Sequence, residues 1–302
     1  MRFSVWPNAS QPWDEILGLA QHAESTGWDG VWIADHFMPN GPDVSGPTHE
    51  CWSLLAALAA SVPRVRLGAL VSGNTYRHPA VLAKAVTTID HVSGGGRVVL
   101  GLGAGWQENE HRAYGIEFFD TGTRLRRLEE ACEIVKRLCT EPRVTFSGTH
   151  YSLEDAPLEP KPAGTLPLLV GGGGEKVTMR IAATWADEWN VWGTPDTLAA
   201  KGKVLEGHCG RLGRDPSTIA RSAQALLFLS DDESWLAERR KAMAGGMAAM
   251  VGTTSELVDV VGAYAAAGVD ELIVPDFTLG SGARKRDTLD RFLTEVAAPF
   301  RS

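Results

Sequence analysis

The segment that most clearly suggests chemistry is a run of four glycines, Val170-Gly-Gly-Gly-Gly-Glu-Lys176. It follows a short apolar run and precedes a segment with helical periodicity. Backbone N–H groups with no side chain in front of them, at the N-terminus of a helix, form a site for anions. We therefore expect a phosphate group, carried by a cofactor or a substrate, along Gly172, Gly173, Gly174 and Glu175.

A second candidate is the adjacent pair Asp35 and His36, which directly follows the apolar segment Gly30–Ala34. The ordinary pKa of a histidine side chain, near 6.5, lets it give or take a proton around neutral pH. Such a pair can also be purely structural, with the aspartate capping a helix and the histidine bound to a backbone carbonyl. We predict that His36 is the catalytic acid or base.

Two further loops combine glycines with polar or aromatic residues. Val71-Ser-Gly-Asn-Thr-Tyr-Arg-His-Pro79 contains Asn74, which can donate and accept hydrogen bonds, and the fixed charge of Arg77. Gly101-Leu-Gly-Ala-Gly-Trp106 has three glycines, which allow a ligand to approach the backbone closely. Trp106, in that loop, could form the wall of a pocket for a flat ring.

Charge and cysteine content exclude several classes of function. The net charge of −8 argues against nucleic acid and anionic membrane surfaces, both of which require a basic face. The four cysteines form no C-x-x-C pair, so we expect free thiols in a reducing cytoplasm and no metal site. The longest weakly polar run, 53–62, is too short for a membrane span, which takes about 20 residues.

The elements that would position these loops alternate along the chain. Short apolar runs rich in β-branched residues are each followed by a segment of helical periodicity. The predicted strands are Phe3–Trp6, Gly30–Ala34, Val65–Val71, Val98–Leu102, Leu168–Val170, Glu188–Val191, Ala223–Leu229 and Glu271–Val274. The predicted helices are Pro12–Thr26, His49–Ser61, Pro79–Val92, Arg124–Cys139, Lys176–Ala186, Thr197–Leu212, Ser255–Ala267 and Lys285–Ala297.

Eight strand–helix units predict an α/β fold, a (β/α)8 TIM barrel forming a single domain over 1–302. In this fold the carboxyl ends of the strands gather the functional loops, and all the candidate residues above follow strands. An open doubly wound sheet uses the same alternation, but its G-x-G-x-x-G marker is broken by Trp106. Two segments interrupt the repeat: a predicted hairpin at 143–154 and a polar, helix-prone insert at 230–246.

Taken together, these motifs resemble the luciferase-like monooxygenase superfamily, and within it the F420-dependent oxidoreductase branch. The markers are Asp35-His36-Phe37, Val71–Pro79, Leu100–Trp106 with Asn109-Glu110, Gly171–Lys176 and Ala186-Asp-Glu-Trp-Asn190. Each motif is weak alone, but five of them occur in order at the strand ends.

The resemblance implies a cofactor at the C-terminal face of the barrel, with its phosphate on Gly172, Gly173 and Gly174. It implies that the cofactor is contacted by Asp35, Asn74, Ala104, Gly105 and Asn109. It also implies a non-proline cis peptide behind the cofactor ring, placed at Ser72-Gly73, and gives His36 the role of proton donor.

The sequence departs from the family pattern at one position. In the sugar-phosphate dehydrogenases of this branch, a glutamate that serves in proton transfer directly follows the glycine pair of the fourth-strand loop. Here Trp106 occupies that position, with Gln107 next. Glu110 lies a helical turn further on, where we expect it to act as a charge at a helix N-terminus. Sugar-phosphate oxidation is therefore in doubt.

The predicted function is hydride transfer between the deazaflavin coenzyme F420 and a small organic substrate. The alternatives are an FMN-dependent monooxygenase on the same fold, since FMN also carries a tricycle and a ribityl phosphate, and a non-catalytic flavin-binding protein. Lys176 and Arg180 could line an exit for the anionic tail of F420, although a solvated helix face would look the same. A homodimer is possible, with the apolar helix 51–60 as one candidate interface.

Overall fold

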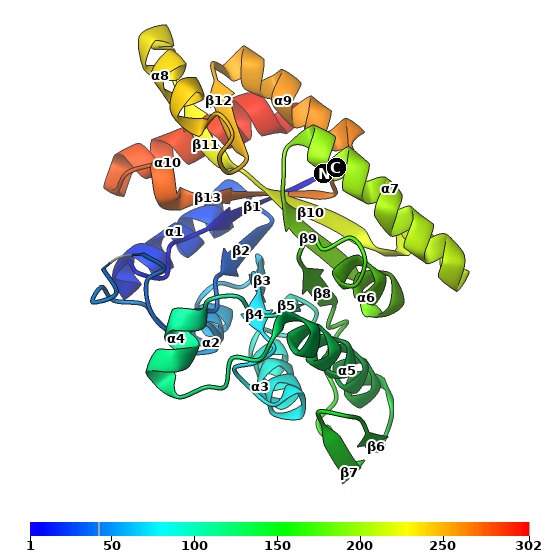
Figure 1. Ribbon diagram of the computed structural model, residues 1–302. Helices are drawn as coiled ribbons and strands as arrows, with labels where there is room; N and C mark the ends of the chain where they lie inside the picture. Colours follow the sequence, from blue (N-terminus) through cyan, green and yellow to red (C-terminus); the bar gives the residue numbers. More distant parts are fainter. Residues whose placement is uncertain (42, 302) are drawn as a thin grey trace.

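The computed structural model describes residues 1–41 and 43–301, and its central feature is a closed parallel β-barrel (Figure 1). The hydrogen-bonded order is β3-β2-β1-β13-β10-β9-β8-β5, and pairing of β5 with β3 closes the ring. The barrel strands are β1 (Arg2–Trp6), β2 (Gly30–Ile33), β3 (Arg66–Ala69), β5 (Val98–Gly103), β8 (Leu168–Gly171), β9 (Glu188–Trp192), β10 (Ala220–Gln224) and β13 (Glu271–Pro275). The predicted TIM barrel is confirmed.

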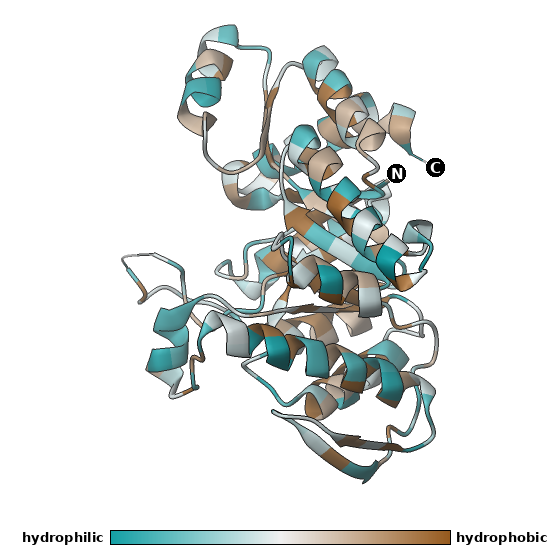
Figure 2. Cartoon of the chain, turned by 45° about the vertical axis from the view of Figure 1, so that its right-hand side comes forward, coloured by the Kyte–Doolittle hydropathy of each residue, from teal (hydrophilic) through white to brown (hydrophobic). Residues whose placement is uncertain are grey.

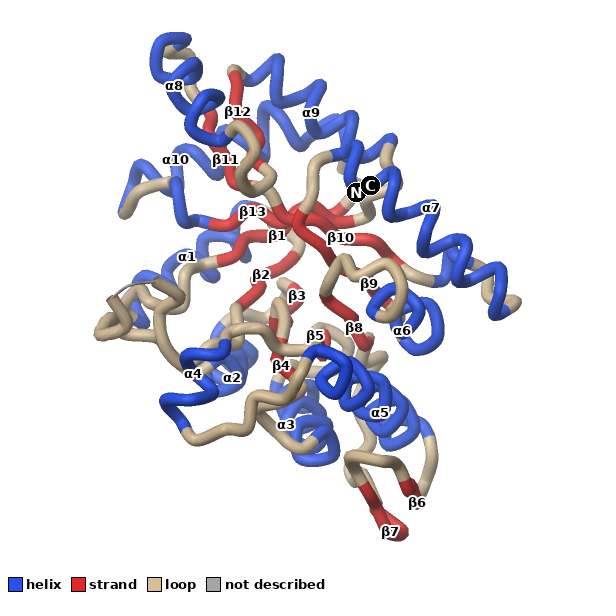
Figure 3. The backbone as a smooth tube through the Cα atoms, viewed as in Figure 1, coloured by secondary structure: helices blue, strands red, loops and turns tan. Residues whose placement is uncertain are grey.

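Helices surround this barrel, as Figure 3 shows by colour. They are α1 (Trp13–Thr26), α2 (Cys51–Ser61), α3 (Pro79–Val92), α4 (Glu108–Tyr114), α5 (Thr121–Thr140), α6 (Thr178–Trp185), α7 (Pro195–Leu212), α8 (Glu233–Met243), α9 (Thr254–Ala266) and α10 (Gly282–Arg291), which a π-helical segment, Phe292–Ala297, continues. Their ends follow from local chemistry: Gly27 ends α1 in the left-handed region at φ 93°, and Thr253 and Glu256 form a capping box before α9. No helix of the described residues is long and apolar enough to span a membrane.

The apolar side chains form two layers. Inside the barrel, Trp6, Trp32, Leu70, Val99, Leu169 and Ile273 pack against one another. Between strands and helices lies a much larger cluster, to which most of the helices contribute one face, while polar residues cover much of the outer faces (Figure 2). The barrel is thus filled below its mouth, which leaves the carboxyl ends of the strands open for a ligand.

Two predicted strands are interrupted in the structure. The third was predicted as continuous from Val65 to Val71, but β3 ends at Ala69 and a short strand β4, Ser72–Gly73, pairs with β5 instead. The predicted cis peptide at Ser72-Gly73 is wrong: the cis bond joins Leu70 and Val71. The seventh strand is divided into β10 and β11 (Leu226–Leu229), and β11 leaves the barrel to pair with β12 (Ala249–Gly252).

The two insertions have the predicted character. The hairpin β6–β7 (Val144–Ser147 and Ser152–Ala156) projects from the barrel beyond α5 (Figure 1). The insert at 230–246 contains α8, which lies between β11 and β12 in the chain. The two ends of the chain meet, because the amino group of Met1 donates a hydrogen bond to the carbonyl of Phe300 at 2.8 Å.

Candidate active site

A cavity of about 810 Å³ opens at the carboxyl ends of the barrel strands. Residues at or just beyond the ends of all eight barrel strands line it. Eight of the residues that the sequence indicates for cofactor or catalysis belong to its wall: Asp35, His36, Ser72, Gly73, Ala104, Gly105, Gly172 and Gly173. The structure therefore brings together loops that are widely separated in the chain.

His36 follows β2 and is held by a buried glutamate. Its Nδ1 lies 2.8 Å from Oε1 of Glu110, and the backbone N–H of Phe37 donates to Oε2 at 2.8 Å. The Tyr76 hydroxyl also donates to Glu110, whose side chain is fully buried on α4. Burial disfavours the charged carboxylate, but the hydrogen bonds from His36, Tyr76 and Phe37 prevail and lower the pKa of Glu110 below its usual value.

An ionised Glu110 fixes the tautomer of the histidine. Because a carboxylate can only accept, Nδ1 of His36 must carry the hydrogen that it donates. Nε2 is then the nitrogen that is available to accept a hydrogen bond or a proton, and it has no hydrogen-bond partner among the described residues. This Glu–His arrangement is the one in which a carboxylate orients an imidazole for acid–base work.

The structure corrects the role predicted for Glu110. The residue does lie in the first turn of α4, as a helix N-terminal charge would. Its side chain, however, is buried and bound to His36, Tyr76 and Phe37, so it is a positioning residue of the site.

Asp35 is buried and paired. The two guanidinium nitrogens of Arg77 donate to its two carboxylate oxygens at 2.6 and 3.1 Å, and Arg77 also contacts Glu50. Burial raises the pKa of Asp35, and the adjacent Arg77 offsets part of the rise. The pair ties the loop after β2 to the loop after β4, so it fixes the position of His36.

The glycines of β5 and β8 make room for the side chain of Val71. A Cβ on Gly103 would lie 2.8 Å from Val71 Cγ2, and one on Gly171 would lie 2.7 Å from the same atom. Val71 itself lines the cavity, and so do Gly103, Ala104 and Gly105. A ligand on this side would therefore contact Val71 and the backbone of 103–105. Gly103 and Gly171 contribute to this surface indirectly, because they leave room for the side chain of Val71.

Only two of the four residues predicted to bind phosphate line the cavity. Gly172 and Gly173 line the cavity, whereas Gly174 and Glu175 lie outside its wall and are exposed. Two residues that the sequence analysis did not select complete the loop. Thr178, the first residue of α6, lines the cavity, and Lys201 on α7 donates from Nζ to the carbonyl of Gly173 at 2.8 Å.

Two other predicted cofactor residues also lie outside the cavity wall. Asn74 is buried and donates from Nδ2 to the carbonyls of Gly103 and Arg124 at 3.2 and 3.3 Å, so it joins the loop after β4 to the end of β5 and to α5. Asn109 is half-buried on α4. Arg180 is also engaged elsewhere, because its guanidinium pairs with both carboxylate oxygens of Glu129.

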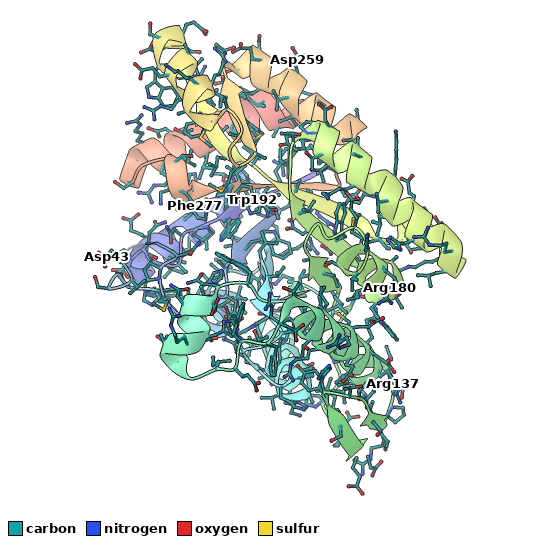
Figure 4. The ribbon with its side chains drawn as sticks, in the orientation of Figure 1. Asp43, Arg137, Arg180, Trp192, Asp259 and Phe277 are labelled. Atoms are coloured by element: carbon teal, nitrogen blue, oxygen red, sulfur yellow. The ribbon has the colours of Figure 1, made fainter. Side chains whose placement is uncertain are left out.

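The opposite wall of the cavity is aromatic. Trp6 lies at the end of β1, Trp192 at the end of β9 and Phe277 just after β13. The Trp6 ring centroid is 5.9 Å from that of Trp192 and 5.1 Å from that of Phe277. Figure 4 shows Trp192 and Phe277 near the centre of the molecule. Trp106, which is 59% exposed, stands at the rim with its ring edge-on to His36 at 5.4 Å.

Comparison with known proteins identifies the family. The model of the luciferase-like monooxygenase family matches residues 1–268. The chain belongs to this family. An F420-dependent glucose-6-phosphate dehydrogenase from Segniliparus rotundus is 35% identical over 233 residues, which are 74% of this chain and 67% of that protein. A protein of the same name from Kineococcus radiotolerans is 40% identical over 166 residues, 54% of this chain and 48% of that one.

Solved structures share the barrel. An F420-dependent secondary alcohol dehydrogenase, solved with an F420–acetone adduct, superposes with a TM-score of 0.84 at 22% identity, and the match covers 100% of both chains. At that identity the likeness establishes the fold. The chain spans about half the length of several of the F420-dependent dehydrogenases that it matches in sequence.

Three residues of the site have roles that could not be recognised from the sequence, and the reason is the same for all three. Glu110, Thr178 and Lys201 lie on helices, and their side chains reach the loops at the strand ends only after the chain has folded. For Glu110 a weak signal exists, since Asn109-Glu110 belongs to one of the family motifs. For Lys201, 28 residues after Gly173, the sequence gives no signal.

Proposed function

We propose that this chain is an F420-dependent oxidoreductase that transfers a hydride between the deazaflavin and a small organic substrate. The observation that carries the proposal is that His36, held by Glu110, lines the same cavity as Gly172 and Gly173 of the glycine-rich loop. The relatives named F420-dependent dehydrogenases support the choice of cofactor.

The residues present fit a phosphate-bearing tricyclic cofactor. Gly172, at φ 128°, adopts a backbone conformation that side chains rarely take, and a Cβ on Gly173 would lie 3.0 Å from Val191 Cγ2. The backbone of this loop is therefore open to the cavity, with Thr178 at the helix start and Lys201 behind it. A helix N-terminus, a hydroxyl and an ammonium group suit an anion. Val71 and the backbone of 103–105 then support the flat ring.

When bound, the cofactor supplies or accepts the hydride. The protein contributes the proton that accompanies it: His36 gives or takes this proton at Nε2, while Glu110 keeps Nδ1 protonated and the ring oriented. The surrounding aromatic side chains exclude water from the reacting atoms. Asp35, neutralised by Arg77, keeps the loop that carries His36 in place.

Titration of the purified protein with F420 and with FMN in one buffer tests this function. We expect a dissociation constant for F420 in the low micromolar range or tighter, equivalent to about −8 kcal/mol, and at least tenfold weaker binding of FMN. Tight FMN binding without F420 binding would instead support an FMN-dependent monooxygenase. Tight F420 binding with no consumption of the reduced cofactor by any acceptor would support a non-catalytic carrier.

We also propose a single domain over residues 1–302, of which 42 and 302 lie outside the described residues, and a cytoplasmic protein that acts on a small molecule without nucleic acid or metal. The three buried thiols of Cys51, Cys132 and Cys209 suit a reducing compartment. For a homodimer, α2 offers little support, because its six buried residues from Cys51 to Ala59 pack into the core of this chain. Sedimentation analysis measures the assembly directly.

A further inference from the structure

The cavity wall has two chemically different halves. The strands β4, β5 and β8 are neighbours in the barrel, and their ends contribute the glycines and the phosphate loop. The strands β9, β10, β13 and β1 are the next neighbours, and their ends contribute Trp192, Gln224, Phe277 and Trp6. Since the first half suits the cofactor, the second half is the space for the substrate. His36, which follows β2, stands where the two halves meet.

This substrate half is almost free of charge. Among the described residues that line the whole cavity there is no lysine and no arginine. The one carboxylate in that described wall, Asp35, is paired with Arg77. A phosphorylated or carboxylated substrate would lose its hydration in this space with no lysine or arginine to replace it, and its binding would therefore be unfavourable.

Gln224 provides a polar group in the substrate half of the cavity. It pairs in register with Trp192, so the two side chains point to the same face of the sheet, into the cavity mouth. Gln224 is 4% exposed, and its Oε1 has no hydrogen-bond partner among the described residues. Buried amide groups are normally hydrogen-bonded, so this oxygen at the cavity wall is free to accept a hydrogen bond from a ligand.

We propose that the substrate is an uncharged, planar, conjugated carbonyl compound that stacks among Trp6, Trp192 and Phe277 and donates a hydrogen bond from an N–H or O–H group of its own to Oε1 of Gln224. This inference rests on the proposed F420-dependent function. The carbon–carbon double bond next to the carbonyl gains a hydride at its β carbon and a proton at its α carbon. Reduced F420 provides the hydride and is oxidised, and His36 provides the proton, which solvent restores.

The proposal separates this chain from its relatives named glucose-6-phosphate dehydrogenases. A sugar phosphate is dianionic and non-planar, whereas the substrate half offers aromatic faces and a neutral amide. Flat unsaturated rings match aromatic walls by offset stacking or edge-on contact. The difference in substrate follows from the side chains at four strand ends, on a barrel that the family shares.

The test uses protein loaded with oxidised F420 and four probes: cinnamamide, methyl cinnamate, cinnamate and glucose 6-phosphate. The first three are nearly identical in shape and differ in charge and in the presence of an N–H donor. In calorimetric titrations we expect cinnamamide to bind at least tenfold more tightly than cinnamate, with methyl cinnamate between them and no binding of glucose 6-phosphate. Turnover is then measured from the absorbance of reduced F420.

Gln224→Met removes the amide with little change in volume. We expect it to weaken cinnamamide binding about tenfold, to the level of methyl cinnamate, and to leave methyl cinnamate unaffected. Gln21→Met, on the exposed side of α1, is the matched control and should change neither probe. The affinity of each variant for F420 checks that the site is folded.

Three results would overturn the substrate class: cinnamate or glucose 6-phosphate binding as tightly as cinnamamide, equal responses of both neutral probes to Gln224→Met, or binding of none of the three cinnamyl compounds. Each of these presupposes that F420 is bound. Absence of F420 binding is a separate result, and it would reject the proposed function itself.

Discussion

The two ends of the barrel use charge in opposite ways. At the amino ends of the strands, Arg2, Arg66, Glu188 and Glu271 are each the first residue of their strand, and they pair with one another inside the barrel. At the carboxyl ends, the described cavity wall contains no lysine or arginine, and its histidine keeps one ring nitrogen free of protein partners.

Glu271 is the centre of the amino-end cluster. It is fully buried, accepts from Ser4 Oγ at 2.6 Å and Trp32 Nε1 at 2.7 Å, and pairs with Arg2 and Arg66 at 3.0 and 2.7 Å. Burial alone would raise the pKa of Glu271, but the guanidinium groups and hydrogen bonds lower it below the usual value. Each of these four charges has a protein partner, so that end serves stability.

At the carboxyl ends of the strands, by contrast, several polar groups have no partner within the described part of the protein. Nε2 of His36, Oε1 of Gln224 and the loop at Gly172 and Gly173 all present polar groups that a ligand would complete. The charges at the amino ends are thus paired within the protein, whereas the carboxyl ends keep polar groups that can pair with a ligand. Binding and catalysis usually lie at the carboxyl ends in this architecture. Substitutions in the amino-end cluster and at His36 should consequently separate stability from activity.

The largest effect is expected for Arg66→Met. It leaves Glu271 and Glu188 buried with one cation fewer, and breaking a buried ion pair costs about 3–5 kcal/mol. The free energy of unfolding, measured by urea titration, should fall by that amount. The turnover of the remaining folded protein should not change, since the cluster lies at the far end of the barrel.

Arg143→Ala is the matched control for this loss of an arginine. Arg143 pairs with Asp155 on the inserted hairpin at 2.9 Å, and both side chains are more than half exposed. Exposed pairs contribute about 0–1 kcal/mol. If the two substitutions were equally destabilising, the amino-end cluster would have no special role in stability.

The second prediction concerns the carboxyl end. In His36→Asn, the amide N–H can still donate to Glu110, but no group remains that exchanges a proton at Nε2. We expect turnover to fall by about 10²–10⁴-fold. The affinity for F420 and the free energy of unfolding should stay close to those of the wild type. A variant that keeps its rate between about pH 6 and 9 would show that His36 only positions the substrate.

The parts of the fold that the sequence predicts are those that depend on local patterns. The barrel follows from alternation of apolar strands and amphipathic helices, and eight repeats specify its closure. The break after Ala69 was not predictable, because it depends on Val71 packing against Gly103 and Gly171 of neighbouring strands. The division of the seventh strand depends on β11 pairing with β12, a contact between two segments that the α8 insert separates in the chain.

The site residues also fall into two groups, those that local motifs predict and those that depend on tertiary contacts. Loops that immediately follow strands, such as those at His36 and Gly172, are visible from local motifs because the fold places them at one end. Glu110 and Lys201 act from helices, and Gln224 acts through register with a neighbouring strand, so their roles require tertiary structure. The amino-end cluster does have a signal in the sequence, because a charged residue stands at the start of four of the strands.

The third prediction uses the pH dependence of stability. The pKa of Glu110 is lower in the folded protein than its usual value of 4.5, so its carboxylate stabilises the fold above that pH, and this contribution is lost as the pH falls through the folded pKa. Glu110→Gln should cost about 1.5–3 kcal/mol at neutral pH, because it removes the charged acceptor of three hydrogen bonds.

Below pH 4.5 the free energies of unfolding of wild type and Glu110→Gln should converge, as urea titrations at a series of pH values will show. Glu141→Gln is the comparison variant. The pKa of Glu141 is also lowered, by hydrogen bonding to Arg137, but this residue lies on the surface and its substitution should change stability little at any pH. A difference between wild type and Glu110→Gln that stays constant throughout the acid range would contradict an ionised Glu110.

The smallest effect is expected at the phosphate loop, for Thr178→Val. Valine keeps the shape of threonine and removes the hydroxyl from the cavity wall, so F420 affinity should fall about tenfold, or about 1.4 kcal/mol. Thr184→Val, on the same helix but with its hydroxyl bound to the carbonyl of Arg180, should leave the affinity unchanged. The effect should also vanish for a deazaflavin that lacks the phosphate. An equal loss for that phosphate-free compound would mean that Thr178 contacts the ring or its side chain instead, and that the anion is held by the glycine backbone alone.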